Sequence, residues 1–447
     1  MTGFIVRTTL ALLCSAAFAA SAWGQDAGER LRIHGSNSIG SDLMPALVED
    51  WLRELEYTGI RRVAAAPALL EVHAVRDGVP LVVELGKRGN AAGFAALVRG
   101  EAELAMLARA PVAREKDDGW QLGDLASPEQ EYVIALNGAA VLVHRDNPLA
   151  RIDVAQLRAV LAGDVGDWSQ LGGHAGPVRV QLGPGNGGLD DYLRERVAGP
   201  RPVRPSSLQR HRDLRAAAAV VARDPMALAV VELSTPLPAG TRALAVSDGA
   251  TAIAPDAAGV RSQDYPLVRR YRLYGGQMMS ALGRSFALYT LTPRAQRVVR
   301  ARGLMSMQLD PAAADAGTDR EALPQAYREA VDGAVRLPVA LRFNLTSLST
   351  VFESGSAQDL ERVAAWMQRP ENRGRRLGVV GFSPDDPTSR LFATMASNNR
   401  ADIVAAWLTE RGIAVQRTRG LGATRPLAGG NDADARARNE RVELWVL

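Results

Sequence analysis

The sequence predicts an α/β chain in which a large region of alternating strands and helices is followed by a small α+β domain. Between Leu31 and Met307, short apolar runs alternate with helical patterns, and several runs end in loops rich in Gly, Ser and Asn. After Pro311 the residues become small and acidic, and apolar patterns resume near Pro338. At about 150 residues per domain, the 447 residues suffice for about three folding units.

The first part of the large region is predicted to contain three strands and two helices. Leu43, Leu47, Trp51 and Leu55 recur at a spacing of four, which places them on one face of a helix. In order, the segments are a strand at 31–34, a loop at 35–40, this helix, a strand at 81–85, a loop at 86–90, a helix over 94–98 and a strand at 102–107. Such an order is typical of an α/β unit with much parallel sheet.

A second set of elements begins near Glu131. Two apolar runs, 132–136 and 139–144, flank Asn137-Gly138, and this dipeptide predicts a hairpin turn between two strands. Asp153 is expected to cap the helix that follows it. The set continues with a strand at 178–182, a loop at 183–188 and a helix over 189–197.

The end of the chain is predicted to be a separate small domain. Residues 308–337 are expected to be a linker with one short helix, and residues 338–447 to form the domain. Its predicted elements are strands at 341–345, 377–380 and 442–446 and helices over 360–367 and 401–408.

The start of the chain has the pattern of a cleaved signal peptide over residues 1–24. Arg7 is the only charge before Asp26, and the apolar stretch between them ends in Ala20-Ser21-Ala22, which suits cleavage. The apolar run is shorter than the ~20 residues that span a bilayer, although a retained membrane anchor stays an alternative. We therefore expect export to the periplasm.

Composition excludes several classes of protein. The 53 basic and 49 acidic residues leave a net charge of +4, which is too balanced for a nucleic-acid-binding chain of this size. The only cysteine, Cys14, lies in the predicted signal peptide, so the mature chain has no thiol for disulfides, catalysis or metal binding. The five histidines show no metal-ligand spacing, and no Gly-x-Ser-x-Gly motif occurs. We expect no catalytic residues, metal or cofactor; an enzyme acting on an anionic substrate is a third, less favoured alternative.

Three loops of the large region, 35–40, 86–90 and 183–188, share one pattern: a strand ends, small residues follow, and a helix begins. The first N–H groups of a helix are unpaired and carry partial positive charge, and small residues let an anion approach them. Loops of this kind that converge would form an oxyanion site. The alternative is that their glycines only make turns.

Five segments of the large region carry motifs of a known family: Gly35 to Ser38, Gly89 to Gly93, Glu103 to Pro111, Val141 to Gly172 and Tyr265-Pro266-Leu267. Through these motifs, residues 31–307 resemble the periplasmic phosphate-binding proteins that serve ABC transporters. The resemblance implies a periplasmic-binding-protein fold over residues 25–307, with two lobes and a ligand cleft between them. The chain would cross between the lobes near 115–130 and return near 230. Phosphate or another small oxyanion is the implied ligand, and an ABC transporter permease a further partner.

The same resemblance implies which residues bind the oxyanion: Gly35, Ser36, Asn37, Ser38, Asn90, Arg109, Gly185, Asn186 and Gly187. Arg109 is the expected countercharge, with a surface or lobe-interface arginine as the alternative. The sequence departs from the family because residues 181–188 lack its Arg-x-x-x-Ser-Gly-Thr pattern, and Ala108 replaces a serine. Each lost contact costs about 1–3 kcal/mol. An envelope protein whose two-lobed domain has lost phosphate and binds a protein partner is therefore the alternative function.

Residues 338–447 resemble the C-terminal peptidoglycan-associating domain of the outer-membrane-protein-A (OmpA) family. The matching pieces are Phe352 to Ala357, Val380 to Ser383, Asn399 to Val404, Gly412-Ile413, Gly420 to Pro426 and Arg436 to Glu443. The resemblance implies that Asp385 and Arg400 hold the diaminopimelate of peptidoglycan, since a carboxylate pairs with an ammonium and a guanidinium with a carboxylate. Glu440 replaces the first arginine of the family's Asn-Arg-Arg motif, and Ala393 stands where an asparagine is common, so weaker wall binding is plausible.

Taken together, these observations predict a periplasmic solute-binding protein without enzymatic activity. Its two-lobed domain is expected to capture a small oxyanion, phosphate first. Its C-terminal domain is expected to tether it to peptidoglycan at the cell wall or outer membrane.

Overall fold

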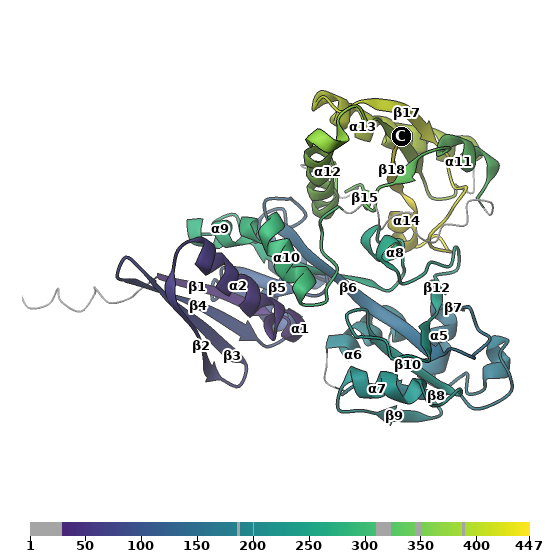
Figure 1. Ribbon diagram of the computed structural model, residues 1–447, viewed down its shortest axis with the longest axis horizontal. Coiled ribbons are helices and arrows are strands. Elements are labelled where there is room, and N and C mark those ends of the chain that lie inside the picture. Colours follow the sequence, from purple (N-terminus) through teal and green to yellow (C-terminus); the bar gives the residue numbers. More distant parts are fainter. Residues whose placement is uncertain (1–28, 186–187, 200, 310–322, 345–350, 387–388) are drawn as a thin grey trace, which may run out of the picture.

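The computed structural model describes residues 29–185, 188–199, 201–309, 323–344, 351–386 and 389–447. The predicted signal peptide, Asn186, Gly187 and most of the predicted linker lie outside these residues. Figure 1 shows two α/β lobes and a C-terminal domain that meet around one long central strand. The predicted fold class, a two-lobed α/β region followed by a smaller α+β domain, is confirmed.

The first lobe is built on a sheet that mixes parallel and antiparallel pairs. Its parallel core consists of β1 (Glu29–Gly35), β4 (Val79–Lys87) and β5 (Leu104–Leu107), with β1 in the middle. The hairpin of β2 (Thr58–Ala66) and β3 (Leu69–Arg76) extends it on the β4 side. The helices are α1 (Asn37–Gly40), α2 (Leu43–Glu54), α3 (Asn90–Val98), α4 (Ala113–Asp118), α9 (Ala281–Tyr289) and α10 (Pro293–Ala301). The predicted face of α2 is buried at Leu43, Leu47 and Trp51.

The second lobe has its own sheet and core. Its strands are β8 (Arg179–Leu182), β9 (Leu208–Arg210), β10 (Ala227–Glu232) and β11 (Thr241–Ala243), with β7 (Arg151–Asp153) and β12 (Ala245–Ser247) as a separate pair. Its helices are α5 (Val154–Ala162), α6 (Gly188–Leu193), the π-helical turn η3 (Arg194–Ala198), α7 (Leu214–Val221) and α8 (Ala257–Arg261). Asp153 caps α5 as predicted, since its side chain accepts from the N–H of Ala155 at 2.8 Å.

One strand, β6 (Glu131–His144), belongs to both lobes, which corrects the predicted hairpin turn at Asn137-Gly138. Its first half pairs with β13 (Val268–Gly275) and its second half with β10. Tertiary contacts outweigh the turn propensity here. Asn137 is buried and donates to the hydroxyl of Tyr271 at 3.1 Å, and a side chain at Gly138 would clash with the backbone of Leu267.

The chain returns to the first lobe along β13, not near residue 230 as predicted. β10 pairs with β8 inside the second lobe. The chain after it stays there, because Leu244, Val260 and Leu267 are buried in the core of that lobe.

The C-terminal domain is a four-strand path, β14-β18-β16-β17, with β15 also paired to β18. Its strands are β14 (Val335–Arg336), β15 (Leu341–Arg342), β16 (Leu377–Phe382), β17 (Val415–Gly420) and β18 (Arg441–Val446). Its helices are α11 (Gln325–Ala330), α12 (Ser354–Met367), α13 (Arg390–Glu410) and α14 (Ala433–Asn439). Part of the predicted linker packs into this domain: Tyr327 lies edge-on against Phe382, and β14 pairs with β18.

The C-terminal domain packs against β6 and the second lobe through buried polar contacts. Arg261 and Asp359 form an ion pair of 2.8 Å in which both side chains are at most 3% exposed. Gln358 of α12 donates to the backbone oxygen of Glu131 in β6 at 2.9 Å. Within the described ranges, none of the helices combines the length and apolarity that crossing a bilayer requires.

Candidate ligand-binding sites

Two predicted loops of the first lobe lie in direct contact. Gly35 ends β1, and its backbone oxygen accepts from the N–H of Gly89 at 2.9 Å. A side chain at Gly93 would clash with the backbone of Gly35, so glycine allows α3 to approach β1 this closely. Ser36 is buried, and its N–H donates to Met106 at 2.8 Å. The ends of β1 and β5 and the start of α3 therefore converge.

Asn90 and the second-lobe loop complete this convergence. The amide oxygen of Asn90 accepts from the N–H of Ala108 at 2.8 Å, which ties α3 to the end of β5. Across the lobe boundary, a side chain at Gly188 would clash with the hydroxyl of Ser38. Gly185 is exposed beside Arg210. The lobes therefore touch at Ser38 and Gly188.

A cavity of about 310 Å³ remains between the lobes, and we call it the interlobe cleft. Asn37 and Ser38 line it from the first lobe. Asp190 and Glu232 line it from the second lobe and add two carboxylates. Arg210 pairs with Asp190 at 3.0 Å, and Arg269 pairs with Glu232 at 2.9 Å. None of the described lining residues is Lys or Arg, so the wall itself presents two carboxylates, whose charges are offset by arginines that lie outside the lining.

Arg269 is the centre of a buried network beneath the cleft. Its guanidinium donates to the backbone oxygen of Gly188 and to the hydroxyl of Tyr271, both at 2.7 Å. Burial alone would lower the pKa of Arg269, but Tyr271 and Glu232 raise it above its usual value. The sequence analysis missed this network. The alternation of Arg269 and Tyr271 along one strand face was the available signal.

Arg109 lies outside the lining of the interlobe cleft. The two terminal nitrogens of its guanidinium donate to the carboxylate of Glu115 at 2.6 and 2.7 Å. Its Nε lies 3.3 Å from the carboxylate of Glu195 in the second lobe. The bond with Glu115 raises the pKa of Arg109. The residue predicted as a countercharge thus already has two protein partners.

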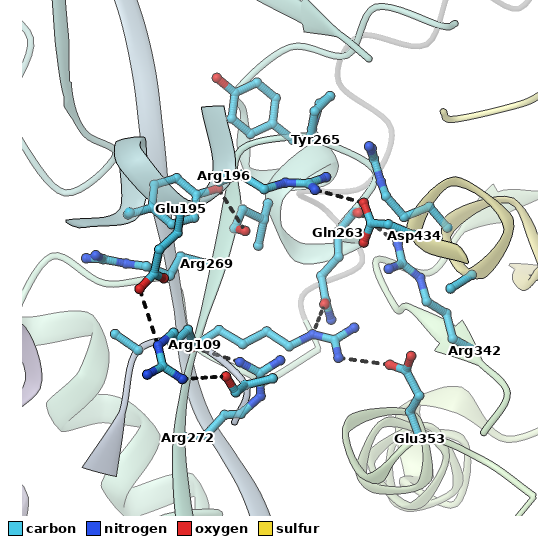
Figure 2. Close-up of a pocket in the computed structure, with 18 residues that line it drawn as sticks. Arg109, Glu195, Arg196, Gln263, Tyr265, Arg269, Arg272, Arg342, Glu353 and Asp434 are labelled. Atoms are coloured by element: carbon cyan, nitrogen blue, oxygen red, sulfur yellow. Dashed lines mark hydrogen bonds and ion pairs between the residues drawn. The ribbon is translucent and has the colours of Figure 1, made fainter. Parts of the chain in front are cut away.

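Arg109 instead lines a second cavity, of about 360 Å³, which we call the junction cavity (Figure 2). Arg109 and Glu195 lie on one side of it, and Arg342, Glu353 and Asp434 of the C-terminal domain lie on the other. The sequence analysis did not predict this cavity, because its walls come from segments far apart in the chain.

The predicted peptidoglycan residues occupy different surroundings. Asp385 lines a cavity of about 620 Å³ together with Arg390, which the sequence analysis missed. Arg400 is not among the described residues that line this cavity. It pairs with Glu440 at 2.5 Å and lies over the ring of Phe343.

Comparison with known structures supports the two-lobed fold. An ABC-type phosphate transport receptor from Vibrio cholerae aligns over 62% of this chain and 99% of its own, with 16% identity and a TM-score of 0.50. PstS from Borrelia burgdorferi aligns over 62% of this chain and 98% of its own, with 14% identity and a TM-score of 0.47. At these identities the likeness concerns the fold. No curated protein sequence matches the chain.

Two family models match different parts of the sequence. The PBP superfamily domain matches residues 59–294, which is more than half of the chain. The OmpA family matches residues 348–440. Both matches confirm the family resemblances identified from the sequence motifs, with the solute-binding region first and the OmpA-like domain after it. The chain therefore belongs to the PBP superfamily, and it carries an OmpA-family domain at its C-terminal end.

Proposed function

We propose that this chain is a binding protein of the cell envelope that captures a small oxyanion, phosphate being the first to test, while its C-terminal domain holds it to peptidoglycan. The observation that carries the proposal is that the loop at Gly35–Ser38 contacts Gly89 within the first lobe and meets Gly188 of the second lobe at Ser38. Backbone N–H groups at such loops bind anions without needing a cationic side chain. The proposal includes no catalytic residue.

The charge of the cleft predicts how strongly it binds. Asp190 and Glu232 face the cavity and repel a phosphate dianion, although Arg210 and Arg269 balance them. We therefore expect weaker binding than in a cleft that presents an unpaired arginine. Replacing Glu232 by glutamine would remove one of the two negative charges from the cleft wall and so reduce the repulsion of the dianion.

Calorimetric titration of the mature chain, residues 25–447, with phosphate tests this proposal. Wild type is expected to bind, and Glu232→Gln to bind about tenfold more tightly, because one of the two carboxylates that repel the anion is removed. Ser38→Phe should abolish cleft binding, since the ring fills the cavity and keeps Gly188 away. Glu361→Gln is the matched control, because that side chain is 64% exposed on the C-terminal domain. A folded wild type and Glu232→Gln that both give no heat would contradict capture.

That negative result would favour the second candidate function, an envelope protein whose two-lobed domain binds a protein partner. The carboxylates in the cleft and the paired state of Arg109 are the observations that favour it. The ABC transporter permease that the resemblance implies belongs with the capture proposal. Phosphate transport would require it.

Wall binding is tested separately, by sedimentation of the mature chain with purified peptidoglycan. Asp385 lines a cavity of about 620 Å³, and its carboxylate suits an ammonium group. Asp385→Asn is expected to reduce the sedimented fraction. An unchanged fraction would remove Asp385 from the proposed wall site.

A further inference from the structure

The junction cavity lies where three parts of the molecule meet (Figure 2). Arg109 reaches it from the end of β5 in the first lobe, and Arg196 from η3 in the second lobe. Arg342 of β15 and Arg438 of α14 reach it from the C-terminal domain. Ligand binding in this cavity would therefore contact both the two-lobed domain and the C-terminal domain.

Arginine dominates the lining of this cavity. The lining arginines are Arg109, Arg196, Arg269, Arg270, Arg272, Arg342 and Arg438. Most of them have a carboxylate partner, and the pairs are Arg109–Glu115 at 2.6 Å, Arg196–Asp434 at 2.7 Å, Arg269–Glu232 at 2.9 Å, Arg270–Glu353 at 2.8 Å, Arg272–Glu131 at 2.7 Å and Arg438–Asp248 at 2.5 Å. Arg342 differs from all of these.

Arg342 has no carboxylate within ion-pair distance among the residues that the structure describes. Its Nη2 donates to the backbone oxygen of Gln263 at 3.0 Å, and its buried Nε has no hydrogen-bond partner. Burial, followed by the positive charge of Arg270, lowers the pKa of Arg342 to about 10. Arg438 contributes to this lower pKa, while the negative charges of Glu353 and Asp264 oppose it. Arg342 is therefore a cation near other cations, and no carboxylate pairs with it directly.

A cation in this position is costly, because its Nε is buried away from water and no carboxylate pairs directly with the guanidinium. An anion in the adjoining cavity would restore the missing compensation. Guanidinium groups bind carboxylate and phosphate oxygens through parallel N–H donors, so a cluster of them favours an anion with several oxygens. The volume of about 360 Å³ suits a small molecule rather than a peptide.

We propose that the junction cavity binds a small oxyanion with two or more negative charges, held by Arg342 between the two-lobed domain and the C-terminal domain. This site is distinct from the interlobe cleft and does not depend on capture there. Since its walls come from both domains, bound anion stabilises their packing against one another. Phosphate-type anions and polycarboxylates share the required chemistry.

Titration of the mature chain with inorganic pyrophosphate and with citrate tests this site. Wild type should bind at least one of the two anions. The one that binds more tightly shows whether the site prefers phosphate oxygens or carboxylates. Arg342→Met should weaken that binding by about tenfold or more, because a charged hydrogen bond is lost. Arg114→Met is the matched control, since it removes the same charge from a side chain that is 92% exposed. Without ligand, Arg342→Met should melt no lower than wild type, because it removes an uncompensated cation.

Two further variants distinguish anion binding in the junction cavity from binding in the interlobe cleft and from a merely structural role of Arg342. Glu353→Gln removes a carboxylate from the cavity wall and should tighten binding, which a merely structural Arg342 does not predict. Ser41→Trp places a large ring in the interlobe cleft from an exposed position and should leave junction binding intact. Binding that Ser41→Trp abolishes but Arg342→Met leaves unchanged would assign the anion to the cleft and overturn this proposal. Absence of binding of both probes to folded wild type would also overturn it.

Discussion

Two glutamates neutralise arginines at or near the proposed binding sites. Glu232 binds Arg269 beneath the interlobe cleft, and Glu440 binds Arg400 on the C-terminal domain. In both places the protein supplies its own carboxylate to the guanidinium. An anionic ligand must displace that carboxylate or bind elsewhere, so both sites are expected to bind weakly.

Glu440→Gln tests this account at the C-terminal domain. Without the negative charge, Arg400 is free to bind a peptidoglycan carboxylate, and the sedimented fraction should rise. A gain of about tenfold in affinity corresponds to one charged hydrogen bond. The matched control is Glu410→Gln, an exposed change at the end of the same helix. Binding that stays equal or falls in Glu440→Gln would contradict a wall-binding role for Arg400.

Single site residues could be predicted where they lie in a family motif, but the residues that bond to them in the structure could not. The family resemblance predicts Arg109 as a countercharge, but its two acid partners lie in different segments of the chain. Glu440 was visible as a departure from a family motif. That it faces Arg400 depends on how α13 packs beside the start of β18, which the motif does not specify.

At the scale of elements, helix α13 lies unusually close to the C-terminal sheet. A side chain at Gly381 in β16 would clash with the backbone oxygen of Ser397, and one at Gly420 in β17 would clash with the backbone of Asn398. Because both sheet positions lack a Cβ, the helix backbone rests directly on the strands. This packing fixes the helix that carries Arg390 and Arg400.

Gly381→Ala is therefore expected to destabilise the domain by about 1–3 kcal/mol, the usual cost of overpacking. Gly378 lies on the same strand, and the nearest atom to a Cβ there would be 3.7 Å away. Gly378→Ala is thus a control with the same chemical change. Urea unfolding of the mature chain measures both variants. Equal midpoints for the two would show that α13 does not pack this closely.

Helices were predicted well where apolar spacing was regular, and β6 shows where local signals fail. The buried face of α2 and the cap of α5 followed directly from the sequence. Asn137-Gly138 is a strong hairpin signal, yet the strand runs through it. Its asparagine is bonded to Tyr271, a residue that comes much later in the chain.

At the scale of the whole molecule, the C-terminal domain is fixed to the two-lobed domain by buried ion pairs. Arg336 donates to Asp264 at 2.6 Å, and Arg438 pairs with Asp248 at 2.5 Å. Both aspartates belong to the predicted two-lobed domain, whereas Arg336 belongs to the predicted linker and Arg438 to the predicted C-terminal domain. The sequence predicted both domains and their order, but it carried no signal for their mutual packing, because each domain has its own complete apolar pattern.

The Asp264–Arg336 pair makes the packing of the two domains sensitive to acid. Burial alone would raise the pKa of Asp264, but Arg336 and Arg441 lower it to about 2, below its usual 3.8. A lowered pKa in the folded state gives stability that is present above the usual pKa and is lost as pH falls towards the folded value. The domains should therefore loosen between about pH 4 and pH 2.

Small-angle scattering of the mature chain across this pH range measures that loosening as an increase in radius of gyration. Arg336→Met should shift the increase to higher pH, because Asp264 then loses its main partner. A radius of gyration that stays constant down to pH 2 in wild type would contradict a role for this pair.

The central claim is that one molecule binds a small oxyanion while attached to the wall. Sedimentation of the mature chain with peptidoglycan in the presence of radiolabelled phosphate tests it most directly. The account predicts labelled phosphate in the pellet in proportion to the protein, above the level carried by peptidoglycan alone. Protein that sediments without phosphate, or that binds phosphate but stays in solution, would contradict the account.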